Sequence, residues 1–416
     1  MIRRIKLFEA FSGMGSQITA MKNILNNKEL LKTIGINPNK FELENVGISE
    51  FFIDAIISYD KLNFGSQEDF PKYKSLTKKV MLKYLFKFTL SKDSKNLCTK
   101  VEIKKLPFEK TRQIYIALKR TKNFGSITDI QGKDLPKIDI FTYSFPCQNL
   151  STIGRGEGIK EGTSSGLLLE VKRLLSELKL VGRLPKFLLC ENVKNILSKK
   201  HIDGWNEFAE FLESLGYKNS IMVLNAKDFG IPQSRERFFC ISQLDGTEKI
   251  EVQKNETCPS IHHFLDLNND ELIDEYKEVM PNLTPSRIKW IDKSKKLNDR
   301  EYCQTITTKQ DRWPNAGILF CDSNGKVINL NRKEVNRNVN DVKELYRFLS
   351  CREQLLLMGF DNSTYNKLKE FGMSKSKIQL MAGNSIVVQK LEAIFVEILK
   401  KLKIKKGLKN VYRNGR

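Results

Sequence analysis

Histidine is scarce in this chain of 416 residues, with only three copies at positions 201, 262 and 263. The eight cysteines include no C-x-x-C pair, so zinc-finger spacing is absent and neither a metal site nor a disulfide framework is expected. The shortage of histidine also argues against a nucleophile activated by a histidine base. Any cysteine chemistry must therefore obtain its thiolate in another way.

Long apolar runs are missing as well. No stretch approaches 18 uninterrupted apolar residues, and the N-terminal "MIRRIKLFEAF" carries Glu9 where a signal peptide would be apolar. These features predict a soluble protein of the cytoplasm that has no membrane partner.

Acidic residues are outnumbered, because 49 Asp and Glu face 71 Lys and Arg, which gives a net charge of +22. Such an excess favours a polyanionic partner, and nucleic acid is the commonest one. A basic surface that serves only solubility is the plainer alternative. Since 40% of the residues are hydrophobic, the chain can form a substantial core.

Short apolar runs alternate with helical patterns from residue 4 to about residue 242, which predicts a doubly wound α/β fold with a largely parallel sheet. The clearest amphipathic helix is expected at 165–182. Strands are expected at 5–11, 46–52, 139–145, 186–193, 220–226 and 237–242. Ligands of such sheets bind at the carboxyl ends of the strands.

The same pattern predicts the division into domains. An α/β domain is expected at 1–244, interrupted by a Lys-rich helical insertion at 60–123 whose role the sequence leaves open. Residues 245–375 are irregular and rich in turns, which predicts a second, smaller domain. Residues 376–416 return to the first domain with an amphipathic helix and a basic tail.

The first candidate site is "FEAFSGMGSQ" (8–17), which places Phe11, Gly13 and Gly15 between a strand and a helix. Glycine lets the backbone approach a ligand, and a helix N-terminus presents free N–H groups. Glu50 ends the next strand, where a carboxylate accepts ribose hydroxyls. The pair suits a nucleoside ligand, and a simple tight turn remains the alternative.

The second candidate site gathers polar residues at other strand ends. "TYSFPCQNLS" places Cys147 after Pro146, and "ENV" places Glu191 at the end of the following strand. In "PQSRERFF", Arg235 and Arg237 alternate onto one face. A thiol, a carboxyl and two guanidiniums would then meet at one edge, where arginines favour a thiolate. Taken singly, each residue also has a plain structural interpretation.

Taken together and in this order, F-x-G-x-G, Pro-Cys-Gln, Glu-Asn-Val and Gln-x-Arg-x-Arg resemble the DNA (cytosine-5) methyltransferases of bacterial restriction–modification systems. "RFLSCREQLLLMGF" (347–360) and "GNSIVVQ" (383–389) are similar to two later motifs of this family. The resemblance covers about 1–59, 124–242 and 347–400. The insertion and "TYSFPCQ" also resemble, more weakly, the CpG-type members of this family.

The resemblance implies a Rossmann-like methyltransferase domain that uses S-adenosylmethionine, with a target-recognition domain at 245–375. It implies methylation of C5 of a cytosine flipped out of a short, specific sequence in double-stranded DNA, through a bond from Cys147 to C6. Glu191 would bind N3 and the exocyclic amine, Arg237 would hold O2, and Arg235 would steady the thiol and the base. A monomer associated with the nucleoid is expected, and any cognate restriction endonuclease would act separately.

Further contacts follow from the resemblance. Those with the cofactor are expected at Phe11, Gly13, Met14, Gly15, Glu50, Phe51, Ile127, Pro146, Asn384 and Ser385. Those with DNA are expected at Gln148, Ser151, Gln233, Thr305 and Ile306.

Three positions depart from the family pattern. Ser126 replaces an Asp of the adenine-binding turn, Ser164 replaces an Arg that contacts phosphate, and Ser350 replaces a Thr. None of them is one of the four catalytic positions. Two alternatives stay open, a cytosine-5 methyltransferase of transfer RNA and an inactive DNA-binding relative. No (Asp/Asn/Ser)-Pro-Pro-(Tyr/Phe/Trp) motif occurs, which disfavours methylation of adenine or of cytosine N4.

Overall fold

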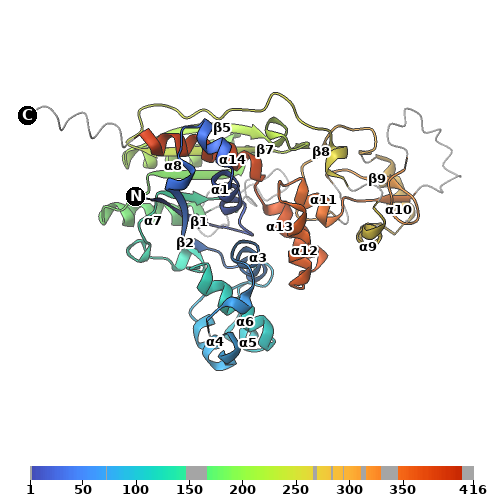
Figure 1. The fold of residues 1–416 in the computed structure, drawn as a ribbon, viewed down its shortest axis with the longest axis horizontal. Coiled ribbons are helices and arrows are strands. Elements are labelled where there is room, and N and C mark those ends of the chain that lie inside the picture. The colour runs from blue at the N-terminus through green and yellow to red at the C-terminus, as the bar shows by residue number, and fades with distance from the viewer. Residues whose placement is uncertain are drawn as a thin grey trace, which may run out of the picture. The chain divides into compact units, whose positions relative to one another are not determined.

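The computed structural model describes residues 2–71, 73–146, 166–265, 269–282, 284–293, 295–310, 315–328 and 345–404. The chain folds into two compact units (Figure 1). The first comprises Met1–Leu224, Glu236–Gln253 and Leu391–Arg416, and the second comprises Asn225–Arg235 and Lys254–Lys390. Cys147, Gln148, Ser151 and Ser164 lie outside the described residues.

A six-stranded sheet forms the centre of the first unit, in the order β2-β1-β3-β4-β7-β5. Its strands are β1 (Arg3–Ala10), β2 (Phe41–Ser49), β3 (Ile140–Tyr143), β4 (Phe187–Val193), β5 (Tyr217–Asn225) and β7 (Glu236–Leu244). β2, β1, β3 and β4 are parallel, and β7 runs antiparallel to β4. The carboxyl ends of the four parallel strands therefore share one edge with the start of β7, which confirms the predicted α/β fold.

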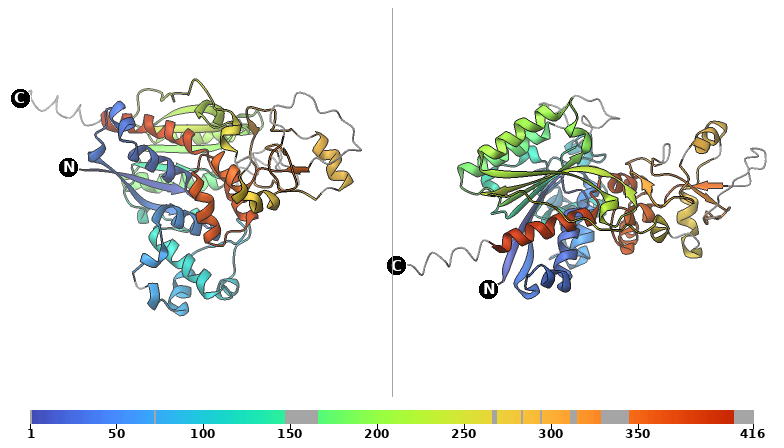
Figure 2. Two further views of the ribbon diagram at one scale, coloured as in Figure 1. Left: turned by 45° about the vertical axis from the view of Figure 1, so that its right-hand side comes forward. Right: turned by 90° about the horizontal axis from the view of Figure 1, so that it is seen from above.

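Helices cover both faces of this sheet (Figure 2). On one face lie α7 (Leu167–Leu180) and α8 (Ile202–Ser214), and on the other lie α1 (Ser16–Asn26), α3 (Ile53–Phe64) and α14 (Val388–Ile404) from Leu391 onward. The short α2 (Lys28–Thr33) follows α1. The alternation along β1 separates the two faces, because Phe8 packs with the core of α7 and α8 while its neighbour Glu9 accepts the N–H of Ile18 on α1.

The basic segment 60–123 is helical, as predicted, and forms the lower group of helices in Figure 1. It contains α4 (Lys78–Leu85), α5 (Lys100–Lys104) and α6 (Phe108–Arg120). Two ion pairs fasten α6 to α3: Arg120 Nε lies 2.8 Å from Asp60 Oδ1, and Lys110 Nζ lies 2.8 Å from Asp54 Oδ1.

The second unit is built from short helices and strands. Its helices are α9 (Ile273–Glu278), α10 (Pro285–Lys293), α11 (Cys351–Leu356), α12 (Asn362–Glu370) and α13 (Lys375–Asn384). Its strands are β6 (Gln233–Ser234), β8 (Cys303–Gln304), β9 (Leu319–Cys321) and β10 (Leu345–Arg347).

The N-terminus of α11 contains a fully buried ion pair. Both oxygens of Glu353 accept hydrogen bonds of 2.8 Å from the guanidinium of Arg347. Ser350 caps the helix, because its hydroxyl accepts the N–H of Glu353 at 3.1 Å and its own N–H binds the Glu353 carboxylate. A threonine would offer the same hydroxyl, which explains why serine serves at this position.

The seven cysteines of the described part are free thiols. Cys190 and Cys240 are buried in the sheet, and burial raises the pKa of the Cys240 thiol to about 12. Among the described helices, none combines the length and the apolar character needed to cross a membrane.

Candidate active site

The glycine loop between β1 and α1 has an unusual backbone. Phe11 has φ 57°, in the left-handed region that non-glycine residues rarely adopt, at a typical cost of about 1–3 kcal/mol. Its N–H is held by the carbonyl of Ser49 at the end of β2, at 2.8 Å. A Cβ added to Gly13 would meet no heavy atom within 4 Å, so the backbone borders open space there. The loop is thus fixed at Phe11 and accessible at Gly13.

Glu50 connects this loop to the end of β2. Its carboxylate accepts the N–H groups of Gly13, Phe51 and Phe52, each at 2.9 Å. Burial raises the pKa of Glu50, and the three N–H donors counteract that rise. A carboxylate offers about four acceptor positions, so one remains for a further donor.

Glu9 lies behind the loop and is fully buried. Its carboxylate accepts the hydroxyl of Tyr59 on α3 and the N–H of Ile18 on α1. Burial raises the pKa of Glu9 from 4.5 to about 7. From the sequence, Glu9 was notable only for its charge. In the structure it joins α1 and α3, the helices that contain Ile18 and Tyr59.

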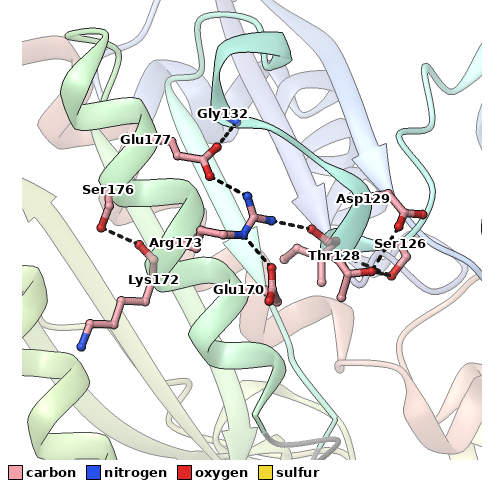
Figure 3. Close-up of polar contacts among 10 residues, drawn as sticks. Ser126, Thr128, Asp129, Gly132, Glu170, Lys172, Arg173, Ser176 and Glu177 are labelled. Atoms are coloured by element: carbon pink, nitrogen blue, oxygen red, sulfur yellow. Dashed lines mark hydrogen bonds and ion pairs between the residues drawn. The ribbon is translucent and has the colours of Figure 1, made fainter. Parts of the chain in front are cut away.

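The turn at Ser126–Asp129 contains the predicted adenine contact, Ile127, which is buried. The hydroxyl of Ser126 lies 2.8 Å from that of Thr128, so serine stabilises the turn locally where the family has Asp. Asp129 is exposed. The carbonyl of Ile127 accepts a hydrogen bond of 3.2 Å from the guanidinium of Arg173 on α7 (Figure 3).

Arg173 is itself fixed by two carboxylates on its own helix, Glu170 at 2.8 Å and Glu177 at 2.7 Å (Figure 3). Glu177 also accepts the N–H of Gly132 at 2.5 Å, and this bond is the main reason why its pKa lies below the ordinary value. A Cβ on Gly132 would lie 2.7 Å from that of Glu177, so α7 approaches the backbone closely here. Arg173 was not among the predicted site residues, although its spacing of three and four residues from acids on one helix could have identified it.

The corner that leads to Cys147 is described up to Pro146. The side-chain amide of Asn192 on β4 donates to the carbonyl of Phe145 at 3.0 Å, and the hydroxyl of Ser144 lies 3.4 Å from the carbonyl of Phe11. β4 and the glycine loop therefore both hold this corner. The sequence analysis quoted Asn192 in "ENV" without assigning it this role.

Glu191 and Arg237 lie together at the same edge of the sheet. In the register of β4 and β7, Glu191 is opposite Phe239 and Val193 is opposite Arg237, so both side chains project from one face. Arg237 Nε lies 3.5 Å from Glu191 Oε1, and the two side chains are 16% and 13% exposed. The structure thus pairs the carboxyl and the guanidinium that were predicted to hold the base.

Arg235 has different surroundings. It belongs to the second unit and is 2% exposed. Its guanidinium donates to the carbonyls of Ile306, Gly383 and Ser385 at 2.7, 2.8 and 2.9 Å. These contacts hold main chain, which the alternation of Arg235 with Arg237 did not indicate.

The other predicted residues of the second unit surround Arg235. Gln233 is buried, donates to the carbonyl of Leu357 at 2.7 Å and accepts the N–H of Ile306, which is itself buried, at 3.0 Å. Thr305 donates its hydroxyl to the carbonyl of Ser234 at 2.7 Å. Asn384 is exposed at the end of α13, whereas Ser385 is buried and its hydroxyl donates to the carbonyl of Met381.

Comparison with known proteins agrees with this geometry. The model of the C-5 cytosine-specific DNA methylase family matches residues 86–400. The type II methyltransferase M2.ScrFI of Lactococcus lactis subsp. cremoris is 35% identical, over 95% of this chain and 99% of that protein. The chain belongs to this family. The methylase is also 32% identical to the orphan methyltransferase M.SssI of Spiroplasma monobiae, over 95% of this chain and 97% of that protein.

Solved structures show the same fold. The S. pombe Dnmt2 methyltransferase has a TM-score of 0.59 at 20% identity and covers 96% of this methylase and 99% of its own chain. The Entamoeba histolytica methyltransferase EhMeth has a TM-score of 0.57 at 15% identity, with the same two coverages. Family membership confirms the predicted enzyme class and cofactor. The methylase transfers a methyl group from S-adenosylmethionine to C5 of cytosine in DNA.

Proposed function

We propose that this methylase modifies a cytosine flipped out of a short, specific sequence in double-stranded DNA, through a covalent bond between Cys147 and C6. The observation that carries the proposal is the half-buried pair of Glu191 and Arg237 at the sheet edge that holds the corner before Cys147. A cytosine presents an acceptor at N3, a donor at the amine and an acceptor at O2. A carboxyl and a guanidinium side by side complement these three groups.

The proposed chemistry begins with the Cys147 thiolate, which adds to C6 and makes C5 nucleophilic. Glu191 binds the amine and supplies a proton to N3 as negative charge develops there. Arg237 donates to O2. S-adenosylmethionine, when bound, supplies the methyl group from its positively charged sulfur. The proton on C5 then leaves to a water molecule. The C5–C6 double bond re-forms as Cys147 is expelled as a thiolate, and N3 returns its proton to Glu191.

For the cofactor, the residues of the first unit fit a nucleoside. Gly13 borders open space, and Glu50 keeps one acceptor position for a ribose hydroxyl. We assign the adenine to Phe11 and Ile127, with Met14, Gly15, Phe51 and Pro146 around it. Asn384 and Ser385 remain our assignments for the methionine end, and of the two only Asn384 has an exposed side chain.

For DNA, we propose that residues 245–375 recognise the sequence, with direct contacts from Gln148, Ser151 and Thr305. Buried Gln233 acts through the main chain of Ile306 and Leu357, which it holds, and Arg235 is a positioning residue for Ile306 as well. Buried Ile306 acts through this held main chain. The target base must leave the helical stack, at a cost of a few kcal/mol, before it reaches Glu191.

We further propose that the methylase acts as a monomer in the cytoplasm and needs no endonuclease for methyl transfer. The printed names of its relatives leave open whether an endonuclease accompanies it, since one is a type II enzyme and another an orphan. Full activity of the purified chain alone, at a mass of 48.1 kDa by light scattering, is the expected result.

The deciding experiment incubates the purified methylase with S-adenosylmethionine and unmethylated plasmid DNA, and reads methylation by bisulfite sequencing. Protected cytosines within one short motif are expected, and Cys147→Ala should lose them while it still binds DNA. Equal loss of transfer and DNA binding would show that Cys147 is structural. Transfer to transfer RNA but not to plasmid DNA would overturn the proposal of a duplex DNA substrate.

A further inference from the structure

The positive charge of this methylase is concentrated in one segment. Residues 60–123 contain 17 Lys and Arg against 6 Asp and Glu, a net charge of +11. These 64 residues therefore hold half of the net charge of +22 carried by all 416 residues. A basic surface needed only for solubility would be spread more evenly over the chain.

Within this segment, basic residues fall into two groups. Those of α6 are used for folding, because Arg120 pairs with Asp60, Lys110 pairs with Asp54, and Arg112 pairs with Glu109. A charge that is already neutralised inside the protein is poorly placed to attract a polyanion. Lys119, the fourth basic residue of α6, lies over the ring of Tyr84 on α4, at 4.0 Å from its centre. The basic residues of α6 therefore all have partners within the protein.

The lysines of α4 and α5 are different. Lys79 and Lys83 lie four residues apart on α4, and Lys100 and Lys104 lie four residues apart on α5. All four are exposed, and none forms an ion pair with another residue of the described part. Lysines with this spacing share one helix face and repel each other, so they do not stabilise their own helices.

The two helices also share a surface. Lys87, one turn beyond Lys83, and Lys100, at the start of α5, line the same hollow. We call the exposed lysines of this region the lysine surface, and its six members are Lys79, Lys83, Lys87, Lys100, Lys104 and Lys105.

The segment is attached directly to the edge of the sheet that carries the site. Ser91 donates its N–H to the carbonyl of Phe51 at 2.8 Å and accepts the N–H of Ile53 at 2.9 Å, immediately after Glu50. Its neighbour Phe88 packs against Gly125, beside the turn that contains Ile127. The lysine surface is thus held on the frame that binds the cofactor.

We propose that the lysine surface binds the phosphates of duplex DNA outside the recognised sequence. This inference rests on the proposed function, since it requires a duplex at the active site. A duplex carries one negative charge for about every 1.7 Å of its length, so the DNA on either side of the target presents an extended row of anions. The lysine surface raises affinity without reading bases and lets the methylase bind DNA before it finds its sequence.

The test compares two duplexes that contain the sequence found in the plasmid experiment. One has about one helical turn (roughly 10 base pairs) and the other about four turns (roughly 40 base pairs). The variant Lys79→Gln/Lys83→Gln/Lys100→Gln/Lys104→Gln removes four charges. The matched control Lys28→Gln/Lys32→Gln removes two exposed lysines with the same spacing from α2. Circular dichroism melting checks that each variant folds.

The slope of log K against log [salt] is negative. On the long duplex, each lost phosphate contact should reduce the size of this slope by about 0.9, so the four-residue variant should reduce it by up to about 3.6. On the short duplex it should bind and methylate as the unaltered chain does, and the control should retain its slope on both. Equal weakening on both duplexes, or no change on either, would overturn the inference. If the four-residue variant loses affinity only for a folded RNA of equal length, the lysine surface binds RNA instead of DNA. If the unaltered chain methylates no plasmid DNA, and so provides no sequence for the duplexes, the proposed function fails independently of the lysine surface.

Discussion

Two neighbouring arginines are used in opposite ways in this methylase. Arg237, at the sheet edge of the first unit, keeps a partly exposed side chain beside Glu191. Arg235, in the second unit, is buried and holds three main-chain carbonyls. The difference teaches that a motif of alternating charged residues does not reveal which of them are available to a substrate, because availability depends on what else each side chain already binds.

The largest expected effect is a loss of the rate of methyl transfer, without a loss of stability, when Glu191 at the sheet edge is changed. Glu191→Gln removes the proton that N3 requires, so the rate of methyl transfer should fall by about 10²–10⁴-fold with little change in stability. Single-turnover transfer of a labelled methyl group measures the rate. The control Glu236→Gln changes an exposed carboxylate that pairs with Lys194, and it should keep nearly full activity. Similar losses of transfer rate in Glu191→Gln and Glu236→Gln would show that the effect is not specific to Glu191.

The next effect tests the other side of the comparison. Arg235→Met leaves three buried carbonyls without this donor, and an unsatisfied buried polar group costs about 1–3 kcal/mol. We expect the free energy of unfolding to fall by about 3 kcal/mol or more, measured by urea titration. Arg237→Met should cost less than Arg235→Met, because the 16% exposure of the Arg237 side chain lets water reach the groups that it leaves. Equal costs would show that both arginines are structural.

Glu9, a buried acid of the first unit, should make the free energy of unfolding depend on pH. Burial raises the pKa of Glu9 from 4.5 to about 7, so the folded state binds this proton more tightly than the unfolded state does. Its contribution to the free energy of unfolding is therefore present below pH 4.5 and is lost as the pH rises to about 7, by an amount on the order of 3 kcal/mol. The variant Glu9→Gln is neutral at every pH. The free energy of unfolding of the unaltered chain, minus that of Glu9→Gln, should therefore fall across this range. A flat difference would contradict the buried, protonated carboxyl.

The smallest effect concerns the turn around Ile127. Arg173→Gln removes the donor that holds the Ile127 carbonyl, so S-adenosylmethionine should bind about tenfold more weakly, or about 1.4 kcal/mol, while the maximal rate of transfer is retained. Calorimetric titration of the cofactor measures the affinity. The control Ser176→Ala, one turn further along α7, should bind the cofactor normally. Unchanged affinity in Arg173→Gln would show that the turn is held by its own contacts.

Much of the fold could be predicted because hydrophobic periodicity is local information. The predicted strands at 139–145 and 186–193 contain β3 and β4, and the predicted helix at 165–182 contains α7. The predicted strand at 237–242 lies within β7, which is longer at both ends. Glu50 was placed correctly at the end of β2. Each of these predictions required only the residues within one element.

The sequence by itself determined the alternation of strands and helices, the glycine loop and the ordered motifs that identify the family. Only the tertiary structure decided that Arg235 is committed to main chain, that Glu50 already binds three N–H groups, and that Arg173 holds the turn that contains Ile127. The physical reason is distance along the chain. The three carbonyls bound by Arg235 lie 71, 148 and 150 residues away from it, and no periodic pattern connects a donor to acceptors that only folding brings together.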